Sequence, residues 1–202
     1  MMMTRNEGNH TRSIATDLKT RSIDDTSEKV IEGYFSTFND ETELFPGAFE
    51  EIDKTAFNKT LNNDIRALVN HDSNIVLGRT KSNTLELRVD DNGLYGSVKI
   101  NENDTDALNL YERVKRGDVD SCSFGFRIIQ EDTEFRDDDS IKWTIKEVDL
   151  HEVSIVTFPA YDTTSVQARM NQKETLESRR ATKNKAHLRE RLNNVKTTKI
   201  SK

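Results

Sequence analysis

Residues 85–100 read LELRVDDNGLYGSVKI, and they carry the clearest pattern in this chain of 202 residues. On each side of the turn sequence at residues 91–93, apolar residues alternate with polar or small ones. Alternation with a period of two is typical of a strand that has one buried face and one face in water. The stretch therefore predicts an antiparallel hairpin, which makes a sheet the central element of the fold.

The segments around this hairpin predict more strands than helices. Asp104 or Thr105 can cap a helix that ends at Arg116, before Gly117, and residues 48–61 fit a helix or two helical turns better than a strand. Further strands are expected at residues 29–38, 64–71, 75–80, 121–130, 141–145 and 147–158. We therefore predict an α+β fold built on a mostly antiparallel, curled sheet or partly closed β-barrel, with two or more flanking helices.

The charges and the polarity divide the chain into three parts. Residues 166–202 hold eleven basic and three acidic residues, a net charge of +8, whereas the whole chain carries -6. Residues 1–28 are mostly polar and are expected to form a flexible N-terminal arm. Residues 29–165 are predicted to be the folded domain, and residues 166–202 a basic tail that is partly helical or disordered. Because the tail has no Phe, Trp or Tyr to stack on bases, specific recognition of nucleic acid is not expected.

The composition argues against several classes of protein. No apolar run is longer than three residues, so neither a membrane-spanning segment nor a signal peptide is expected. The single cysteine, Cys122, excludes an internal disulfide and a cysteine-based zinc site. No cluster of His, Asp or Glu has the spacing of metal ligands. A soluble protein that uses neither a metal nor a cofactor is therefore expected.

Ser123 and His71 are the candidate nucleophile and base of a serine hydrolase. This chemistry needs a hydroxyl that attacks, an imidazole that takes its proton, and a third group that orients the imidazole. His71 follows the apolar residues 67–69, where a strand is expected to run into a loop. In the strand at residues 121–130, alternation places Ser123 on the polar face and Cys122 with the phenylalanines, where a buried neutral thiol is expected. We expect Ser123 to be exposed in a cleft.

The third member of such a triad has two candidates on the last strand. In residues 147–158, alternation places Glu152 in a row of apolar residues that includes Leu150 and Val156. A carboxylate in an apolar row needs a partner, and a histidine is one suitable partner. His151 is the competing candidate, although alternation points it to the opposite face of the strand. An edge position, where Glu152 reaches water or an arginine, is the structural alternative.

Taken in order, these segments resemble the prohead proteases of tailed bacteriophages, which are relatives of the herpesvirus assemblin serine proteases. The resemblance covers about residues 30–166 and implies an assemblin-like fold. The matching segments are IEGYFSTF with LFPGAF downstream, ALVNHD, IVLGRT, LELRVDDNGLYGSVKI, YERVKRGDVDSCSFGFR and EVDLHEVSIVTFPAYDTTSV.

The resemblance also implies catalytic roles. His71 occupies the position of the family's histidine in its Asn-His-Asp setting, and Ser123 occupies the position of its serine. Alignment with the assemblins puts Glu152 at the position of their second histidine. His151, the competing candidate in this chain, comes one residue earlier. Where assemblins carry an arginine pair that contributes to the oxyanion hole, this sequence has Pro159 and Ala160. Proline has no N–H to donate, so the Ala160 amide is the candidate donor.

The family further implies substrates and a place of action. Such an enzyme is a serine endopeptidase that processes scaffold protein, the major capsid protein and its own ends while the procapsid matures in the cytoplasm of the bacterial host. A dimer is expected by analogy with assemblins, and the basic tail is hypothesised to dock on an acidic scaffold before it is trimmed. Two alternatives stay open: a catalytically inactive capsid-assembly or scaffolding component, and a nucleic-acid-binding protein that uses the basic tail.

Overall fold

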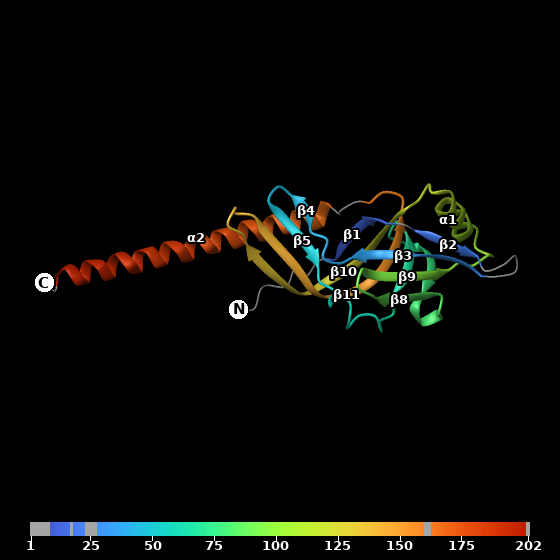
Figure 1. Cartoon of the computed structure of the whole chain (residues 1–202), viewed down its shortest axis with the longest axis horizontal. Helices are drawn as coiled ribbons and strands as arrows, with labels where there is room; N and C mark the ends of the chain where they lie inside the picture. Colours follow the sequence, from blue (N-terminus) through green and yellow to red (C-terminus); the bar gives the residue numbers. More distant parts are fainter. Residues whose placement is uncertain (1–8, 17, 23–27, 160–162, 201–202) are drawn as a thin grey trace. The chain divides into compact units, whose positions relative to one another are not determined.

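The computed structural model describes residues 9–16, 18–22, 28–159 and 163–200 (Figure 1). Its internal contacts divide the chain into two units, Met1–Ser165 and Val166–Lys202, and every described strand lies in the first unit. In chain order the elements are β1 (His10–Ala15), β2 (Lys19–Ser22), β3 (Lys29–Thr37), β4 (Thr42–Phe45), β5 (Ala48–Ile52), β6 (Arg66–Val69), β7 (Asp72–Arg79), the short 3-10 helix η1 (Thr80–Ser82), β8 (Leu85–Val89), β9 (Gly93–Lys99), α1 (Thr105–Arg116), β10 (Ser121–Phe135), β11 (Ile141–Val156) and α2 (Thr163–Ile200).

The strands form two sheets, and the first is built around the long hairpin of β10 and β11 (Figure 1). Its order is β1-β10-β11-β5-β4, with β6 pairing with both β11 and β7. β5 lies parallel to the first part of β11 and β6 lies parallel to its last part. The second sheet has the order β2-β3-β9-β8 and is antiparallel throughout. The first sheet thus sets β6, β10 and β11 next to one another, and these strands carry or flank the candidate site residues.

The expected partly closed β-barrel was wrong, because both sheets stay open. A barrel closes only when its two edge strands pair with each other. Among the described strands, β1 and β4 end the main order of the first sheet and do not pair, and neither do β2 and β8 in the second. β5 and β6 pair with different parts of the same edge of β11. The first sheet therefore branches at β11 instead of continuing around a barrel. The α+β class with mostly antiparallel strands and two helices is confirmed.

The helical turns expected at residues 48–61 are a strand followed by a series of turns. Ala48, Glu50 and Ile52 are buried and alternate with less buried neighbours, as the pairing of β5 on both edges requires. Residues 54–62 form consecutive turns that bury Phe57 completely. A series of turns spaces its apolar side chains much as a helix does, which explains why the sequence pattern was misleading.

The polar N-terminal segment contains two strands where a flexible arm was expected. β1 pairs antiparallel with β10, and β2 pairs antiparallel with β3. Backbone hydrogen bonds hold both strands to the body of the protein. Such strands need no alternating apolar pattern, so the composition of residues 1–28 did not reveal them.

The two strongest local predictions are confirmed, and both elements contribute to the core. β8 and β9 form the hairpin expected at residues 85–100. α1 follows Asp104, whose carboxylate accepts hydrogen bonds from the backbone N–H groups of Asp106 and Ala107, and it ends at Gly117 with a φ of 84°. One apolar cluster joins both sheets and α1. Its largest fully buried aromatic side chains are Phe35, Phe57, Phe124 and Phe126.

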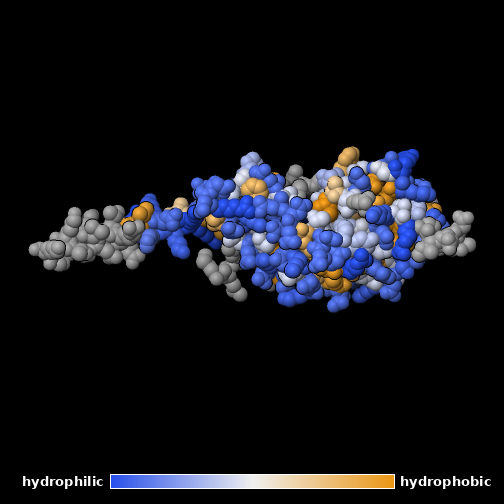
Figure 2. Space-filling view, in the orientation of Figure 1, coloured by the Kyte–Doolittle hydropathy of each residue, from blue (hydrophilic) through white to orange (hydrophobic). Residues whose placement is uncertain are grey.

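The described residues of the second unit belong to α2, a helix of 38 residues that starts at Thr163. Residues 166–202 were predicted to be a partly helical or disordered basic tail. The side chains described along α2 are mostly exposed and hydrophilic (Figure 2). None of the helices that the structure describes is long and apolar enough to cross a membrane.

Candidate active site

β10 places Ser123 on the face of the sheet that points away from the apolar core. Cys122, Phe124 and Phe126 belong to the core, so Ser123 and Gly125, which alternate with them, lie on the other face. Burial raises the pKa of the Cys122 thiol and keeps it neutral, which removes the stronger intrinsic nucleophile from consideration. The Ser123 hydroxyl is therefore the remaining candidate for the nucleophile in this part of β10.

A β-bulge at His151 decides the direction of the Glu152 side chain. On β11, Glu152 pairs with Gly125 whereas Leu150 pairs with Phe126, so His151 is an extra residue without a paired residue on β10. The bulge shifts the alternation by one residue. Leu150 therefore enters the core, and Glu152 joins the polar face of β10. The apolar row predicted around Glu152 was wrong, because the alternation was continued across the bulge.

His71 lies in the two-residue turn between β6 and β7. Asn70 and His71 have positive φ angles of 49° and 61°, the conformation that a tight hairpin turn requires at both central residues. The turn is tied to the end of β11, since the Asn70 N–H donates to Ile155 O at 3.0 Å and Asn70 Oδ1 accepts from the Thr157 N–H at 2.9 Å. Positive φ is uncommon outside glycine and is often found at functional sites, where surrounding contacts hold it.

The contact between His71 and Glu152 is the centre of the site. Glu152 Oε1 lies 2.7 Å from His71 Nδ1. An ionised carboxylate can only accept, so Nδ1 carries the proton of the neutral ring and Nε2 is its basic nitrogen. The Ser154 hydroxyl donates to Glu152 Oε2 at 2.6 Å and accepts from the His71 backbone N–H at 3.2 Å. Both oxygens of the Glu152 carboxylate therefore have a hydrogen-bond partner. In a serine hydrolase the acid of the triad contacts and orients the catalytic histidine in the same way.

Ser123 shares this face of the sheet but is buried, and its hydroxyl is bonded to β1. It pairs with Ser154 of β11, which sets its side chain on the face of His71 and Glu152. The side chain is fully buried, and Ser123 Oγ donates to the carbonyl oxygen of Arg12 at 2.9 Å. The prediction that Ser123 is exposed in a cleft was wrong, since its side chain is buried and its hydroxyl is bonded to the backbone of the neighbouring strand β1. Within the described ranges, no hydrogen bond joins Ser123 to His71.

The remaining candidates lie apart from this contact or beyond the described residues. The side chain of His151 contacts Asp149, with 3.4 Å between Nε2 and Oδ2. Ala160, the candidate oxyanion donor, lies outside the described residues. The contacts of Ser154 with Glu152 and His71 were not predicted from the sequence. The only indication in the sequence is that this hydroxyl lies two residues after Glu152 on the same strand. In the part of the chain that the structure describes, no three His, Cys, Asp or Glu side chains are grouped so as to hold a metal ion.

Comparison with known proteins adds an independent observation to this geometry. The family model described as caudovirus prohead serine protease matches residues 16–179. The chain belongs to this family. Among solved structures, this prohead serine protease family member is similar to the bacteriophage T4 capsid assembly protease, gp21, with a TM-score of 0.43 and 11% sequence identity, covering 74% of this chain and 99% of that chain. No curated protein matches it.

Gly125 gives the Glu152 carboxylate the space that it occupies in this prohead protease family member. A Cβ atom at position 125 would lie 2.3 Å from Glu152 Oε1 and 3.0 Å from its carboxyl carbon. Gly125→Ala is therefore expected to displace the carboxylate from His71 and to lower the rate of peptide cleavage by about 10²-fold, a typical effect of a small misplacement in an active site. The thermal unfolding temperature should change little, because the displaced atoms end a flexible side chain.

Gly117→Ala is the control with the opposite expectation. A Cβ there has no neighbour within 4 Å, but the φ of 84° strains any residue other than glycine. This variant should lower the unfolding temperature and keep the cleavage rate. Full activity in Gly125→Ala would show that the close approach of residue 125 does not hold Glu152 in place.

Proposed function

We propose that this chain is a serine endopeptidase in which Ser123 is the nucleophile, His71 the general base and Glu152 the group that orients the base. The observation that supports this most strongly is the 2.7 Å contact between His71 Nδ1 and Glu152 Oε1, on the face of the sheet that holds Ser123. Membership of the prohead serine protease family supports the same class of reaction.

In the proposed reaction, His71 Nε2 takes the proton of the Ser123 hydroxyl while the oxygen attacks a peptide carbonyl carbon. The intermediate collapses when His71 gives this proton to the leaving amine, and the acyl group stays on Ser123. Water that His71 deprotonates then releases the acyl group. Glu152 stabilises the imidazolium in both steps, and Ser154 holds Glu152 through its hydroxyl. The Ala160 amide is the proposed donor to the oxyanion.

The proposed substrates belong to the assembling capsid. The family supports a role in the prohead, so scaffold protein, the major capsid protein and the enzyme's own ends are the substrates that we assign to it. The site of action is the procapsid inside the host cytoplasm. Residues 166–202, with their net charge of +8, suit an acidic scaffold surface, and self-cleavage would remove them afterwards.

Co-expression with the scaffold and major capsid proteins of the same phage tests this function. Intact-mass spectrometry of all three proteins is compared between the wild-type chain and Ser123→Ala. The wild-type chain should yield shortened capsid and scaffold proteins and shortened ends of its own, whereas Ser123→Ala should leave every mass at full length. Full-length masses in both samples, with a normal assembly of procapsids, would favour the inactive assembly component over the protease.

A further inference from the structure

Backbone pairing lays β1 along the edge of β10, directly beside the candidate nucleophile. Six consecutive residue pairs join the two strands. Ser13 lies opposite Ser123, and the carbonyl oxygen of Arg12 accepts the hydrogen bond of the Ser123 hydroxyl. Adding an extended segment to the edge of a sheet is a general way to bind a peptide: the backbone supplies affinity, and pockets for alternate side chains supply specificity.

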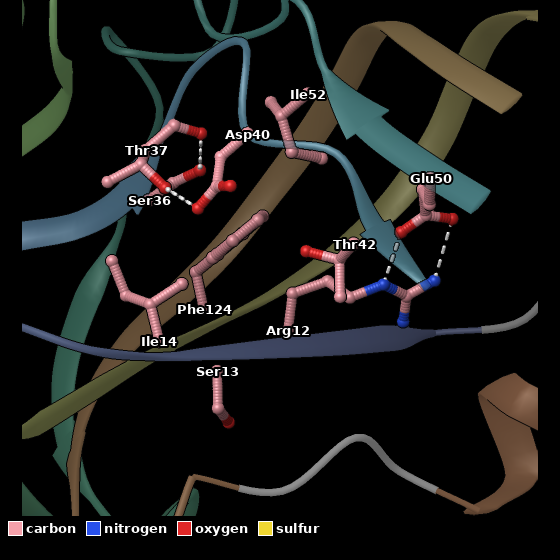
Figure 3. Close-up of a pocket in the computed structure, with 10 residues that line it drawn as sticks. All are labelled: Arg12, Ser13, Ile14, Ser36, Thr37, Asp40, Thr42, Glu50, Ile52 and Phe124. Atoms are coloured by element: carbon pink, nitrogen blue, oxygen red, sulfur yellow. Dashed lines mark hydrogen bonds and ion pairs between the residues drawn. The ribbon is translucent and has the colours of Figure 1, made fainter. Parts of the chain in front are cut away.

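The Arg12 side chain lines a pocket beside β1, whereas the Ser13 side chain points to the other side of the strand (Figure 3). The guanidinium donates two hydrogen bonds to Glu50 of β5, one from Nε to Oε1 and one of 2.9 Å from Nη2 to Oε2. Only 5% of Arg12 and 3% of Glu50 is exposed. Ile52 and Phe124 line the same pocket. A buried two-point contact of this kind suits the planar guanidinium and rejects neutral and acidic side chains.

β1 differs from the strands that build the rest of the sheet. Its sequence, HTRSIA, is mostly polar. The family match begins at Thr16, directly after β1, whereas β6, β10 and β11 lie inside it. A buried ion pair such as that of Arg12 with Glu50 contributes little net stability compared with apolar packing, although it fixes the register of a segment. β1 also accepts the hydrogen bond of the buried Ser123 hydroxyl, the group that a substrate has to reach. These are the features of a bound peptide.

We propose that β1 is an internal pseudosubstrate that occupies the peptide-binding groove of the protease, and that Glu50 selects peptides with arginine or lysine at the position of Arg12. This inference rests on the proposed function. While β1 is bound, the Ser123 hydroxyl donates to Arg12 O and not to His71, and no other peptide reaches it. β1 leaves the groove before cleavage, and a segment of a substrate protein with a basic residue takes its place.

The first test measures access to Ser123 in the full-length chain. Arg12→Glu sets a like charge beside Glu50, so β1 should detach, and the rate at which a small fluorophosphonate labels Ser123 should rise by about 10-fold or more. Arg21→Glu is the matched control on β2: its side chain is 50% exposed and 3.6 Å from Glu32, so labelling should stay within about twofold of wild type. Equal labelling of Arg12→Glu and wild type would overturn the pseudosubstrate.

A charge swap and a measurement on the wild-type chain guard against a folding defect. Arg12→Glu combined with Glu50→Arg restores an ion pair in the opposite sense and should return labelling toward the slow wild-type rate. In wild-type protein, the amide hydrogens of β1 should exchange through local opening, well before those of the core strand β11. Exchange of β1 only together with β11 would show that β1 is a permanent strand of the fold and would refute the inference.

The second test measures the selection of a basic side chain by binding. A fluorescent peptide of residues 9–16 is titrated into the full-length Arg12→Glu, Ser123→Ala chain, and a peptide that carries Arg12→Glu is the control. The arginine peptide should bind about 10-fold more tightly or better, which anisotropy measures without any catalysis. Preference for the arginine peptide, together with no peptide cleavage by the chain that keeps Ser123, would refute only the proposed protease function. Equal binding of both peptides, together with cleavage by the chain that keeps Ser123, would refute only the role of Glu50.

Discussion

Replacing Ser123 with alanine is expected to lower the rate of peptide cleavage by about 10⁴–10⁶-fold, because the attacking oxygen is removed. The fold should be retained. Ser123 is buried and donates one hydrogen bond, to Arg12 O, and a neutral hydrogen bond contributes about 1 kcal/mol to the free energy of unfolding. Cleavage of a peptide with a basic residue and thermal unfolding of the purified chain measure the two effects separately.

Ser121→Ala is the matched control for this experiment. Ser121 lies two residues before Ser123 on the same face of β10, is 1% exposed, and donates to Asp120 Oδ1 at 2.9 Å. Its loss should change the cleavage rate by less than about threefold, since the residue has no role in the proposed reaction. Residual cleavage by Ser123→Ala at the wild-type rate, or an equal loss in both variants, would contradict the assignment of the nucleophile.

The elements with a strong local pattern could be predicted from the sequence. The hairpin of β8 and β9 follows from the alternation in residues 85–100, and the bounds of α1 follow from the capping residue Asp104 and from Gly117. These signals lie within one element or its turn, so they need no knowledge of the partner strands. The residue types of the candidate site could be chosen in the same way, from the hydroxyl, imidazole and carboxylate that the chemistry needs.

Features that depend on pairing between distant segments could not be predicted. The bulge at His151 exists only because β11 is paired with β10, and it alone moves Glu152 to the face of Ser123. β1 shows no apolar alternation, because it is held by backbone hydrogen bonds and by the ion pair of Arg12 with Glu50, 38 residues away. The same limit explains the barrel that was expected, since the branching at β11 is a property of the pairing.

Glu152→Gln is expected to lower the cleavage rate by about 10³–10⁴-fold, less than Ser123→Ala, because the nucleophile and the base are still present. Glutamine keeps the shape of the side chain. It has no charge to stabilise the imidazolium of His71, and its amide group can hold the ring in the tautomer that protonates Nε2. Since Glu152 contacts both His71 and Ser154, the unfolding temperature is measured in parallel with the cleavage of a peptide substrate.

His151→Ala decides between the two candidates for the third member. The bulge consists of an extra backbone residue, so removing the imidazole of His151 should leave the bulge, and with it the direction of Glu152, unchanged. The lost side chain contacts Asp149, and the rate should therefore fall by less than about 10-fold. A loss at His151→Ala that exceeds the loss at Glu152→Gln would reverse the assignment. His151 would then orient the base, and the contact of Glu152 with His71 would be structural.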